Sequence, residues 1–394
     1  MTKHIIKQDQ TTQWHIDDSS DTWILAKDAT ITVSMQTAVY EDDTRSDNRI
    51  VIDGDIQSDN PIQITPTYGI STYGTNTRIE VNASAKVAGD TAVVMRGGNE
   101  TLVNEGKLIG DDYGVETSSN SGEIINSGLI KGYQAVSGYQ YGLHIVNAVD
   151  GDIKGTYNGI YYFSSQDLKI ENAGLIKASV NAITDGDGDA DITNTGIIKG
   201  NVVLGAGDDR FDTRGGKLIG EITGGDGSDT YIVDTSDIVI HESILNGSDA
   251  IRSMVDFTLV DNVEKFYLIG GADIDGTGTI SADKLFGNGG RNQLSGLAGE
   301  DLLDGGKGND RLRGGGDSDT FVFSSGDGHD VVLDFDGLQD RIDLAGMNDI
   351  KTYDDLMKNH VKVSDGDLTI VSGSDEILLK NVVKADLSEA GFDF

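Results

Sequence analysis

Between residues 78 and 204 the chain repeats one pattern of apolar and polar positions. Each copy has a short run of strand-forming residues, then Asn, a small residue, usually Gly, and an apolar pair. The repeated Asn occurs at nearly even intervals, at Asn82, Asn104, Asn126, Asn147, Asn172 and Asn194. A weaker copy at 50–57 has Asp53 in the Asn place. This period predicts a parallel β-helix with about 22 residues in each rung.

Each copy is too short to bury its own apolar face, so the copies have to stack. Stacking places equivalent residues about 4.8 Å apart along the axis. We expect four isoleucines to fill the interior: Ile124, Ile145, Ile170 and Ile192. We expect the repeated Asn to form a ladder of side-chain amides at a turn, where Asn tolerates a positive φ. Residues 78–204 resemble the rungs in passenger domains of bacterial surface proteins.

The second half has a shorter period of nine residues. Four nonapeptides follow one another at 287–295, 296–304, 305–313 and 314–322. Two more occur at 204–212 and 224–232, and a degenerate copy follows at 325–333. Leu294, Leu303, Leu312 and Phe321 recur every nine residues, at position 8 of each tandem copy. A disordered Gly/Asp-rich linker has no use for that register, so the pattern favours a folded repeat.

The nonapeptides match GGxGxDxUx, where U is apolar, and by this pattern the chain resembles the RTX (repeat-in-toxin) family of secreted bacterial proteins. Glycine lets the turn aim its carbonyls inward, and position 6 supplies a carboxylate. Calcium takes about six to eight oxygen ligands, which stacked carboxylates and carbonyls provide. Two nonapeptides close one coil, so we expect Asp301 to face Asp319 and Asn292 to face Asp310. The separate copies that contain Asp209 and Asp229 are expected to stack on each other as an isolated coil.

The predicted calcium ligands and turn residues share positions 2, 4 and 6 of the nonapeptides. They are Gly205, Gly207, Asp209, Gly225, Gly227, Asp229, Asn292, Gly299, Asp301, Gly308, Asp310, Asp319 and Asp330. Two positions depart from the pattern, because Asn292 is neutral and Asp317 stands where a glycine belongs. The alternating acids of 185–192 also resemble the start of an EF-hand calcium loop. This alternative is weaker, because the twelfth position of that loop would be Gly196 and not Glu.

The predicted fold is therefore all-β: a parallel β-helix, then an RTX parallel β-roll, then a C-terminal β cap. We expect four segments: an N-terminal β-rich cap at 1–77, the β-helix at 78–204, the calcium-binding β-roll with connecting rungs at 205–333, and the cap at 334–394. Within the last segment, 352–359 reads as one short helix with Thr352 as N-cap. The resemblance implies that this tail is an uncleaved signal for type I secretion.

Composition supports a cation-dependent fold. The formal charge is −36, which argues against a nucleic-acid ligand and makes the compact chain repel itself. Bound calcium would remove that repulsion and add folding free energy. Cys is absent, which excludes a disulfide scaffold. The sequence has no long apolar run, and its first thirty residues lack the apolar core of an ordinary secretory signal.

Motifs for catalysis are missing. The sequence contains no HExxH, GxSxG, GxGxxG or GxxxxGK[ST], which argues against a zinc protease, a lipase and a nucleotide-binding enzyme. We therefore expect a calcium-binding structural protein of the cell surface or matrix, with an S-layer, biofilm or adhesin role and possible self-assembly into a lattice or filament. A polysaccharide lyase or epimerase, which in the family combines a β-helix with these repeats, is the main alternative, and a toxin or bacteriocin is another.

Two surface features bear on possible partners. Four lysines follow the repeated Asn at similar distances, and stacking would align them: Lys131, Lys154, Lys177 and Lys199. Such a stripe is either an ordinary solvated face or a binding site for an anionic cell-surface glycan. Six of the 13 Tyr lie between 133 and 162, where they either pack between rungs or stack on sugars.

Overall fold

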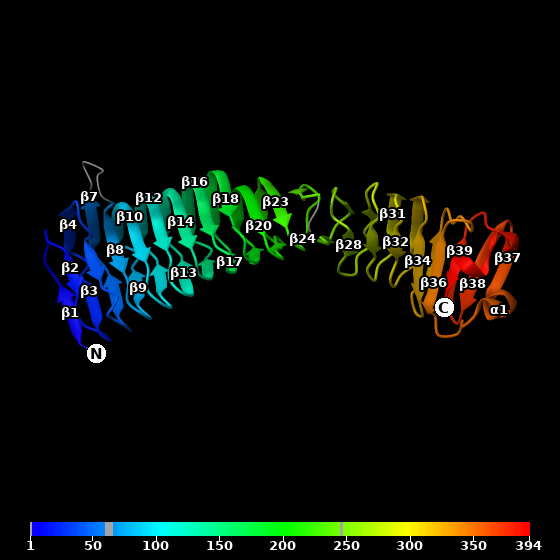
Figure 1. Cartoon of the computed structure of the whole chain (residues 1–394), viewed down its shortest axis with the longest axis horizontal. Helices are drawn as coiled ribbons and strands as arrows, with labels where there is room; N and C mark the ends of the chain where they lie inside the picture. The colour runs from blue at the N-terminus through cyan, green and yellow to red at the C-terminus, as the bar shows by residue number, and fades with distance from the viewer. Residues whose placement is uncertain (1, 60–65, 245–246) are drawn as a thin grey trace. The chain divides into compact units, whose positions relative to one another are not determined.

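The computed structural model describes residues 2–59, 66–244 and 247–394, and these residues are almost entirely β (Figure 1). The chain divides into two compact units, residues 1–227 and 228–394. The predicted all-β class with a parallel β-solenoid is confirmed. None of the helices in the described ranges is long and apolar enough to cross a membrane.

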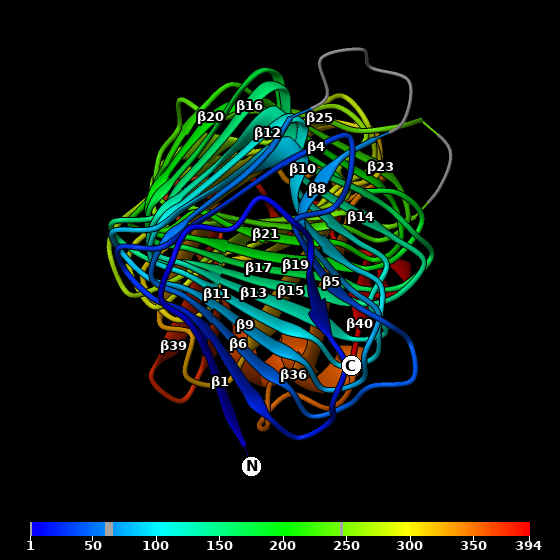
Figure 2. The same ribbon diagram turned by 90° about the vertical axis from the view of Figure 1, so that its left-hand side faces the viewer.

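One face of the first unit is a ladder of parallel strands, each from a successive rung (Figure 2). Its members are β1 (Lys3–Ile6), β3 (Thr22–Leu25), β6 (Arg49–Ile52), β9 (Arg78–Val81), β11 (Thr101–Asn104), β13 (Gly122–Asn126), β15 (Leu143–Asn147), β17 (Leu168–Asn172), β19 (Ala190–Asn194) and β21 (Arg210–Asp212). The ladder starts at β1, so the segment before residue 78 also forms parallel rungs.

The opposing strands form the second ladder of this unit, again parallel and in chain order. They are β2 (Trp14–Ile16), β5 (Val39–Glu41), β8 (Tyr68–Thr72), β10 (Lys86–Met95), β12 (Lys107–Thr117), β14 (Leu129–Tyr139), β16 (Asp152–Phe163), β18 (Leu175–Thr184), β20 (Ile197–Ala206) and β23 (Glu221–Asp226). The shorter β4 (Thr30–Ser34) and β7 (Asp55–Asp59) pair ahead of β10, and β22 (Lys217–Ile219) pairs with β20.

The interior of the first unit is filled as predicted. Ile124, Ile145, Ile170 and Ile192 are neighbours in register, and all four are fully buried. Burying each of these side chains contributes roughly 1.5–3 kcal/mol. Because a rung supplies only a few such residues, the neighbouring rungs have to complete the core.

The amide ladder is also present, with two corrections. The Asn Nδ2 groups donate to the next Asn Oδ1 at 2.7–2.8 Å from Asn104 through Asn194. Asn82 is not a member, because Val81 is the residue in register with Asn104, and the Asn82 amide bonds to Asp53 instead. The expected positive φ was wrong: the Asn104–Asn194 ladder residues end β-strands and have none.

The second unit has two parallel ladders of its own. The first contains β24 (Thr230–Val233), β26 (Ala250–Ser253), β28 (Lys265–Leu268), β30 (Lys284–Phe286), β32 (Leu302–Asp304), β34 (Thr320–Ser324), β36 (Arg341–Gly346) and β40 (Phe392–Asp393). The second contains β27 (Phe257–Thr258), β29 (Gly276–Thr277), β31 (Gln293–Ala298), β33 (Arg311–Gly316), β35 (His329–Val332) and β39 (Asp375–Leu379). The strand β25 (Val239–His241) also lies in this unit.

The C-terminal part of the second unit changes from parallel to antiparallel pairing. β39 pairs antiparallel with β38 (Asp367–Ser372), and β38 pairs antiparallel with β37 (Val361–Ser364). The expected short helix is present as α1 (Tyr353–Asp355), continued by a π-helical turn at Leu356–His360. Its N-cap is Thr352, whose Oγ1 accepts the backbone N–H of Asp355 at 3.2 Å. Because antiparallel strands do not continue a parallel coil, this hairpin closes the ladder.

Candidate calcium-binding site

The tandem nonapeptides stack on every second copy, as predicted for a coil that two nonapeptides close. Leu303 on β32 pairs with Leu285 on β30 and Phe321 on β34, while Leu294 on β31 pairs with Leu312 on β33. All five side chains are buried. Position 8 therefore builds the core of each coil. This register also fixes the direction of position 6, which lies two residues earlier at the end of the turn.

The position-6 side chains form two carboxylate ladders, one on each edge of the coil. In one ladder the backbone N–H of Asp301 donates to Asp319 Oδ1 at 3.0 Å. In the other, the N–H of Asn292 donates to Asp310 Oδ1 at 2.7 Å, and the N–H of Asp310 donates to Asp330 Oδ1 at 2.8 Å. Each carboxylate thus holds the coil that precedes it with one oxygen. The predicted pairs Asp301–Asp319 and Asn292–Asp310 are adjacent.

The second oxygen of these carboxylates is the feature that points to a cation. Asp301 Oδ2 and Asp310 Oδ2 are buried and have no hydrogen-bond partner. Burial, followed by the negative charges of neighbouring aspartates, raises the pKa of Asp301 to about 7 and the pKa of Asp310 to about 6. The same causes raise the pKa of Asp319 to about 6 and that of Asp330 to about 7. A buried anion without a counterion is costly, so these sites are suited to a positive ligand.

The glycines at position 1 leave room for these oxygens. A Cβ added to Gly296 would lie 2.0 Å from Asp301 Oδ2, and one added to Gly305 would lie 2.6 Å from Asp310 Oδ2. A Cβ on Gly314 would lie 2.1 Å from Asp319 Oδ2. A side chain at these positions would overlap the carboxylate, so these turns require glycine. The donor set is oxygen alone, as calcium prefers, and no Cys or His competes for the ion in these turns.

The remaining predicted residues occupy the turns as expected from the pattern. Glycines at positions 2 and 4 have positive φ values, which a β-carbon disfavours: Gly205 98°, Gly207 131°, Gly225 134°, Gly227 128°, Gly299 105° and Gly308 152°. In the first unit, Asp209 Oδ1 accepts the backbone N–H of Ala190 at 2.6 Å. In the second unit, the N–H of Asp229 donates to Asp249 Oδ1 at 2.8 Å. The assignment of all thirteen residues to calcium remains a prediction.

The two departures from the pattern have local explanations. The Asn292 amide is already engaged, since its Nδ2 donates to the carbonyl of Ile274 at 2.6 Å and its Oδ1 accepts the N–H of Asn288 at 2.8 Å. Asp317 takes the glycine-like backbone with φ 73°, and its Oδ2 accepts the N–H of Gly299 at 3.3 Å. Asn292 therefore behaves as a structural member of its ladder, whereas Asp317 keeps the turn shape despite its side chain.

Sequence reasoning missed several members of the ladders. Asp283 donates its N–H to Asp301 Oδ1 at 2.8 Å, and Asp340 Oδ1 accepts the N–H of Asp319 at 3.0 Å. Both precede a buried strand residue by two positions, Leu285 and Ile342, but their turns lack the glycine pattern. The triplet of Asp, any residue and a buried apolar residue was the signal that could have found them.

A further acidic group in the second unit also escaped prediction. Carboxylate oxygens of Asp229, Glu242 and Asp249 lie within 4.8 Å of one another. Burial, then the charges of Glu242 and Glu264, raises the pKa of Asp249 to about 6. Glu242 lies in a segment without glycine repeats, so no local sequence pattern predicts that it joins this group.

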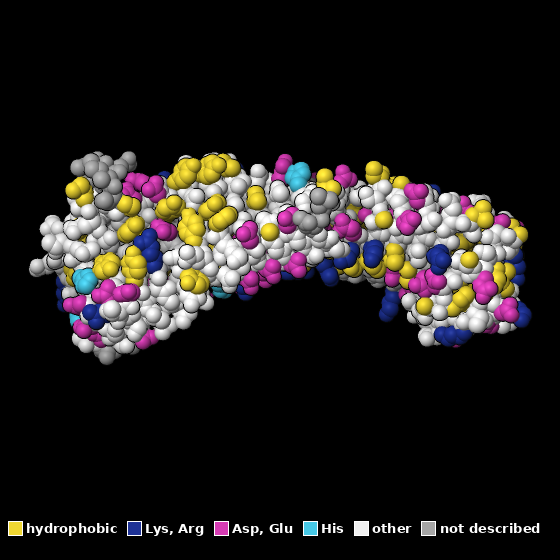
Figure 3. All heavy atoms as spheres, viewed as in Figure 1, with side chains coloured by type: hydrophobic (Ala, Val, Ile, Leu, Met, Phe, Trp, Pro, Cys, Tyr) yellow, Lys and Arg dark blue, Asp and Glu magenta, His cyan; other side chains and the backbone are white. Residues whose placement is uncertain are grey.

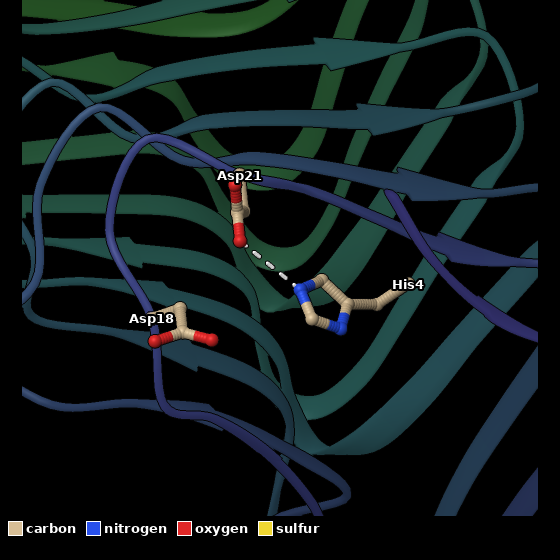
Figure 4. A group of neighbouring side chains, drawn as sticks. All are labelled: His4, Asp18 and Asp21. Carbon is tan, nitrogen blue, oxygen red and sulfur yellow. Dashed lines mark hydrogen bonds and ion pairs between the residues drawn. The ribbon is translucent and has the colours of Figure 1, made fainter. Parts of the chain in front are cut away.

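The first unit has one more group of potential ligands, at its N-terminal end (Figure 4). His4 Nε2 lies 3.1 Å from Asp21 Oδ2. Asp18 lies beside them, on the same loop between β2 and β3 as Asp21 (Figure 4). The Asp21 carboxylate also accepts the backbone N–H of Thr2, and its pKa is lowered by that bond and by the bond to His4. The His4 ring stacks on Trp23 with 3.9 Å between centroids. These contacts account for the group as part of the first rung.

Comparison with known proteins supports the interpretation of the turns. The family model described as RTX calcium-binding nonapeptide repeat (4 copies) matches residues 277–312, 286–321 and 298–332. The chain carries RTX calcium-binding repeats. These matches cover the coils from Asp283 through Asp330, where the free carboxylate oxygens lie. The RTX repeats are calcium-binding, which identifies the expected ion.

Two solved structures are similar to parts of this chain. The AlgE6R3 subunit from the Azotobacter vinelandii mannuronan C5-epimerase is 35% identical, and the match covers 32% of this chain and 81% of that one with a TM-score of 0.27. The extracellular lipase LipA from Serratia marcescens is 16% identical, and the match covers 58% of this chain and 40% of that one with a TM-score of 0.28. No curated protein sequence matches.

Proposed function

We propose that this chain is a secreted calcium-dependent structural protein whose RTX coils fold when calcium binds. The observation that carries the proposal is the pair of carboxylate ladders, in which Asp301 and Asp310 keep a buried, unpartnered oxygen. Without calcium these carboxylates repel one another and resist burial. An ion that binds only the folded coils shifts the equilibrium toward them. RTX proteins are typically secreted, and calcium is more available outside the cell than inside.

The direct test is to follow folding while calcium is added to chelated protein. Far-UV circular dichroism of the full chain should gain β-signal as calcium binds, and chelator should reverse the gain. An otherwise identical titration with magnesium is the control, because magnesium demands a tighter octahedral shell and dehydrates reluctantly. A spectrum that is the same with calcium and with chelator would contradict the proposal.

The surface of the first unit suggests what the folded protein contacts. Lys131, Lys154, Lys177 and Lys199 are neighbours in register on β14, β16, β18 and β20. Three of these lysines are exposed, and Lys154 is half-buried with its Nζ 2.5 Å from Asp152 Oδ2. In-register stacking sets these charges about 4.8 Å apart. A regular row of cations on a chain with charge −36 is suited to a polyanion with regularly spaced charges.

Aromatic side chains lie next to this lysine row. Tyr133 and Tyr157, on the same two strands as Lys131 and Lys154, stack with 5.2 Å between ring centroids and are 48% and 43% exposed. Exposed apolar side chains gather over β14 to β18 (Figure 3). Aromatic faces pack against sugar rings, and lysines bind carboxylates, so together they favour an anionic polysaccharide as the partner. Attachment to such a glycan fits an adhesive or matrix role.

Binding to a soluble polyuronate tests the glycan proposal. The variant K131E/K177E/K199E should lose binding in a calcium-containing pull-down or titration, because three of the four row charges are reversed. The matched control is K86E/K107E, a pair that is also in register on β10 and β12 but is outside the row. Equal binding by both variants and the parent would remove the proposal.

Assembly and catalysis are decided by two further measurements. Light scattering on calcium addition should rise if folded chains form a lattice or filament, and should stay flat if they remain monomers. The same polyuronate incubated with the protein should keep its length and epimer composition if the chain is structural. Unsaturated sugar ends or a changed epimer content would instead favour a lyase or epimerase.

A further inference from the structure

The turn at residues 185–190 forms the layer that precedes the first predicted nonapeptide in the first unit. A Cβ built on Gly205 would lie 2.0 Å from the carbonyl oxygen of Gly186, and one built on Gly207 would lie 2.6 Å from that of Gly188. In the strands that follow, Ile192 pairs with Phe211. The offset between partners is the same in the turn and in the strands, so residues 185–193 stack on residues 204–212 position by position.

This alignment exposes a degenerate nonapeptide that the glycine pattern alone did not reveal. The segment 185–193 reads DGDGDADIT, with Gly at positions 2 and 4 and a buried Ile at position 8. Position 6 is Ala190, so the usual carboxylate is missing. Position 1, which is Gly in the three copies from 296 to 322, is Asp185. This copy therefore has an acid at position 1 and none at position 6, the reverse of the copies from 296 to 322.

The geometry of the tandem coils shows why this exchange can preserve a cation site. In those coils a Cβ at position 1 would point into the carboxylate of position 6, at 2.0 Å from Asp301 Oδ2 for Gly296 and 2.1 Å from Asp319 Oδ2 for Gly314. A side chain at position 1 therefore enters the same space that the position-6 carboxylate fills. When position 6 is Ala, that space is open to Asp185.

The Asp185 carboxyl is buried and lacks hydrogen-bond partners. Its side chain is 4% exposed, and neither Oδ1 nor Oδ2 has a hydrogen-bond partner. Burial raises the pKa of Asp185 to about 8, with further contributions from the negative charges of Asp209, Asp187 and Asp167. Asp209 belongs to the next layer and is itself 2% exposed. Two buried acids thus meet between the two turns.

We propose that Asp185 is a calcium ligand that replaces the missing position-6 carboxylate, and that it completes a cation site between turn 185–190 and turn 204–209. The charged groups that face Asp185 are all acidic, and the glycine turns expose backbone carbonyls, so the site offers oxygen ligands alone. This site lies in the first unit, outside residues 277–332 that match the family model. The inference rests on the proposed calcium binding by the RTX coils.

Calcium counting on the full chain tests this assignment. Chelator-treated protein is dialysed to equilibrium against calcium, and bound ions per chain are measured for the parent, D185A, D187A and D185G/A190D. We expect D185A to bind one ion fewer than the parent. The matched control D187A changes an exposed acid in the same turn and should keep the full count. D185G/A190D rebuilds the standard nonapeptide and should also keep the full count.

The outcomes separate this inference from the proposed function. A parent chain that binds no calcium defeats the proposed function itself. Calcium binding by the parent with an unchanged count in D185A overturns only the role of Asp185, which would then be a buried neutral acid. Loss of an ion in D187A as well, or one additional ion in D185G/A190D, also overturns it. If D185A fails to fold, as judged by circular dichroism, the count of D185G/A190D decides.

Discussion

The two units use different side chains for the same task of joining one coil to the next. In the first unit, each amide from Asn104 to Asn172 donates to the next Asn and so satisfies its neighbour. In the second unit, Asp301 and Asp310 each accept one backbone N–H with Oδ1 and have no hydrogen-bond partner for Oδ2. An amide both donates and accepts, whereas a carboxylate only accepts.

This difference separates a self-sufficient ladder from a conditional one. The amide ladder is neutral, and within it only Asn104 Oδ1 at its start is buried without a hydrogen-bond partner, so its rungs carry no charge that a ligand must offset. The carboxylate ladder adds negative charge with each coil and has buried, unpartnered oxygens at Asp301 and Asp310, so its folding is expected to depend on a cation. On the proposed function, the amide ladder of the first unit should fold without calcium, whereas the carboxylate ladders of the second unit should need it.

Removing calcium should produce the largest difference in stability between the two ladders. With excess chelator, hydrogen exchange in residues 283–340 should become fast, while residues 101–180 stay protected because their ladder is neutral. Exchange measured by mass spectrometry resolves the two regions. Loss of protection in both regions would show that the β-helix depends on calcium as well, and would break the distinction.

Truncation of a core side chain should also lower the unfolding free energy differently in the two regions. Ile145→Ala leaves a cavity in a fully buried site and should cost about 3 kcal/mol of unfolding free energy, with or without calcium. Leu303→Ala should cost a similar amount in calcium and nothing in chelator, where its coil is already open. Denaturant unfolding measures both. Sensitivity of the Leu303 region in chelator would contradict the prediction.

Converting one amide of the ladder to a carboxylate tests the chemistry directly. Asn147→Asp removes the Nδ2 donor to Asn172 Oδ1 and places an acid among amides, so the first unit should lose about 2 kcal/mol. Thermal unfolding in chelator gives the measurement. The exposed substitution Asn120→Asp is the matched control and should change little. Equal effects of the two changes would mean that the ladder contributes no more than surface charge.

A dependence on pH is also expected in the first unit. Burial raises the pKa of Glu100 to about 8 from the ordinary value of 4.5, and the charge of buried Glu41 adds to the shift. The folded chain therefore holds this proton more tightly than the unfolded chain, so the stabilisation is complete below pH 4.5 and is lost as pH rises toward 8. Glu100→Gln should flatten that decline in chelator. An unchanged pH slope would assign it to other groups.

Both solenoid periods could be predicted because each rung repeats its own pattern. The isoleucine stack and the Asp301–Asp319 and Asn292–Asp310 pairs followed from spacing alone, since stacking converts sequence period into contact. Prediction was less accurate where the copies differ by a residue. Asn82 looked like a ladder member, but the register places Val81 there.

Residues without a local pattern could not be assigned in advance. Glu242 joins Asp229 and Asp249 from an irregular segment, and Asp283 and Asp340 lie in turns without the glycine pattern. Asp185 appeared in an acidic segment that suggested an EF-hand, and only the stacking of Gly186 under Gly205 shows which nonapeptide position it occupies.

The amino-acid sequence by itself determined the two periods, the apolar residues of the core and the calcium chemistry of the glycine-aspartate turns. These follow from local spacing, because a repeated rung meets copies of itself. Only the tertiary structure decided the register between unequal copies, the carboxylate oxygens that lack partners and the acids that non-repeating segments bring together. Those depend on how loops of different length align the next coil, and no single copy carries that information.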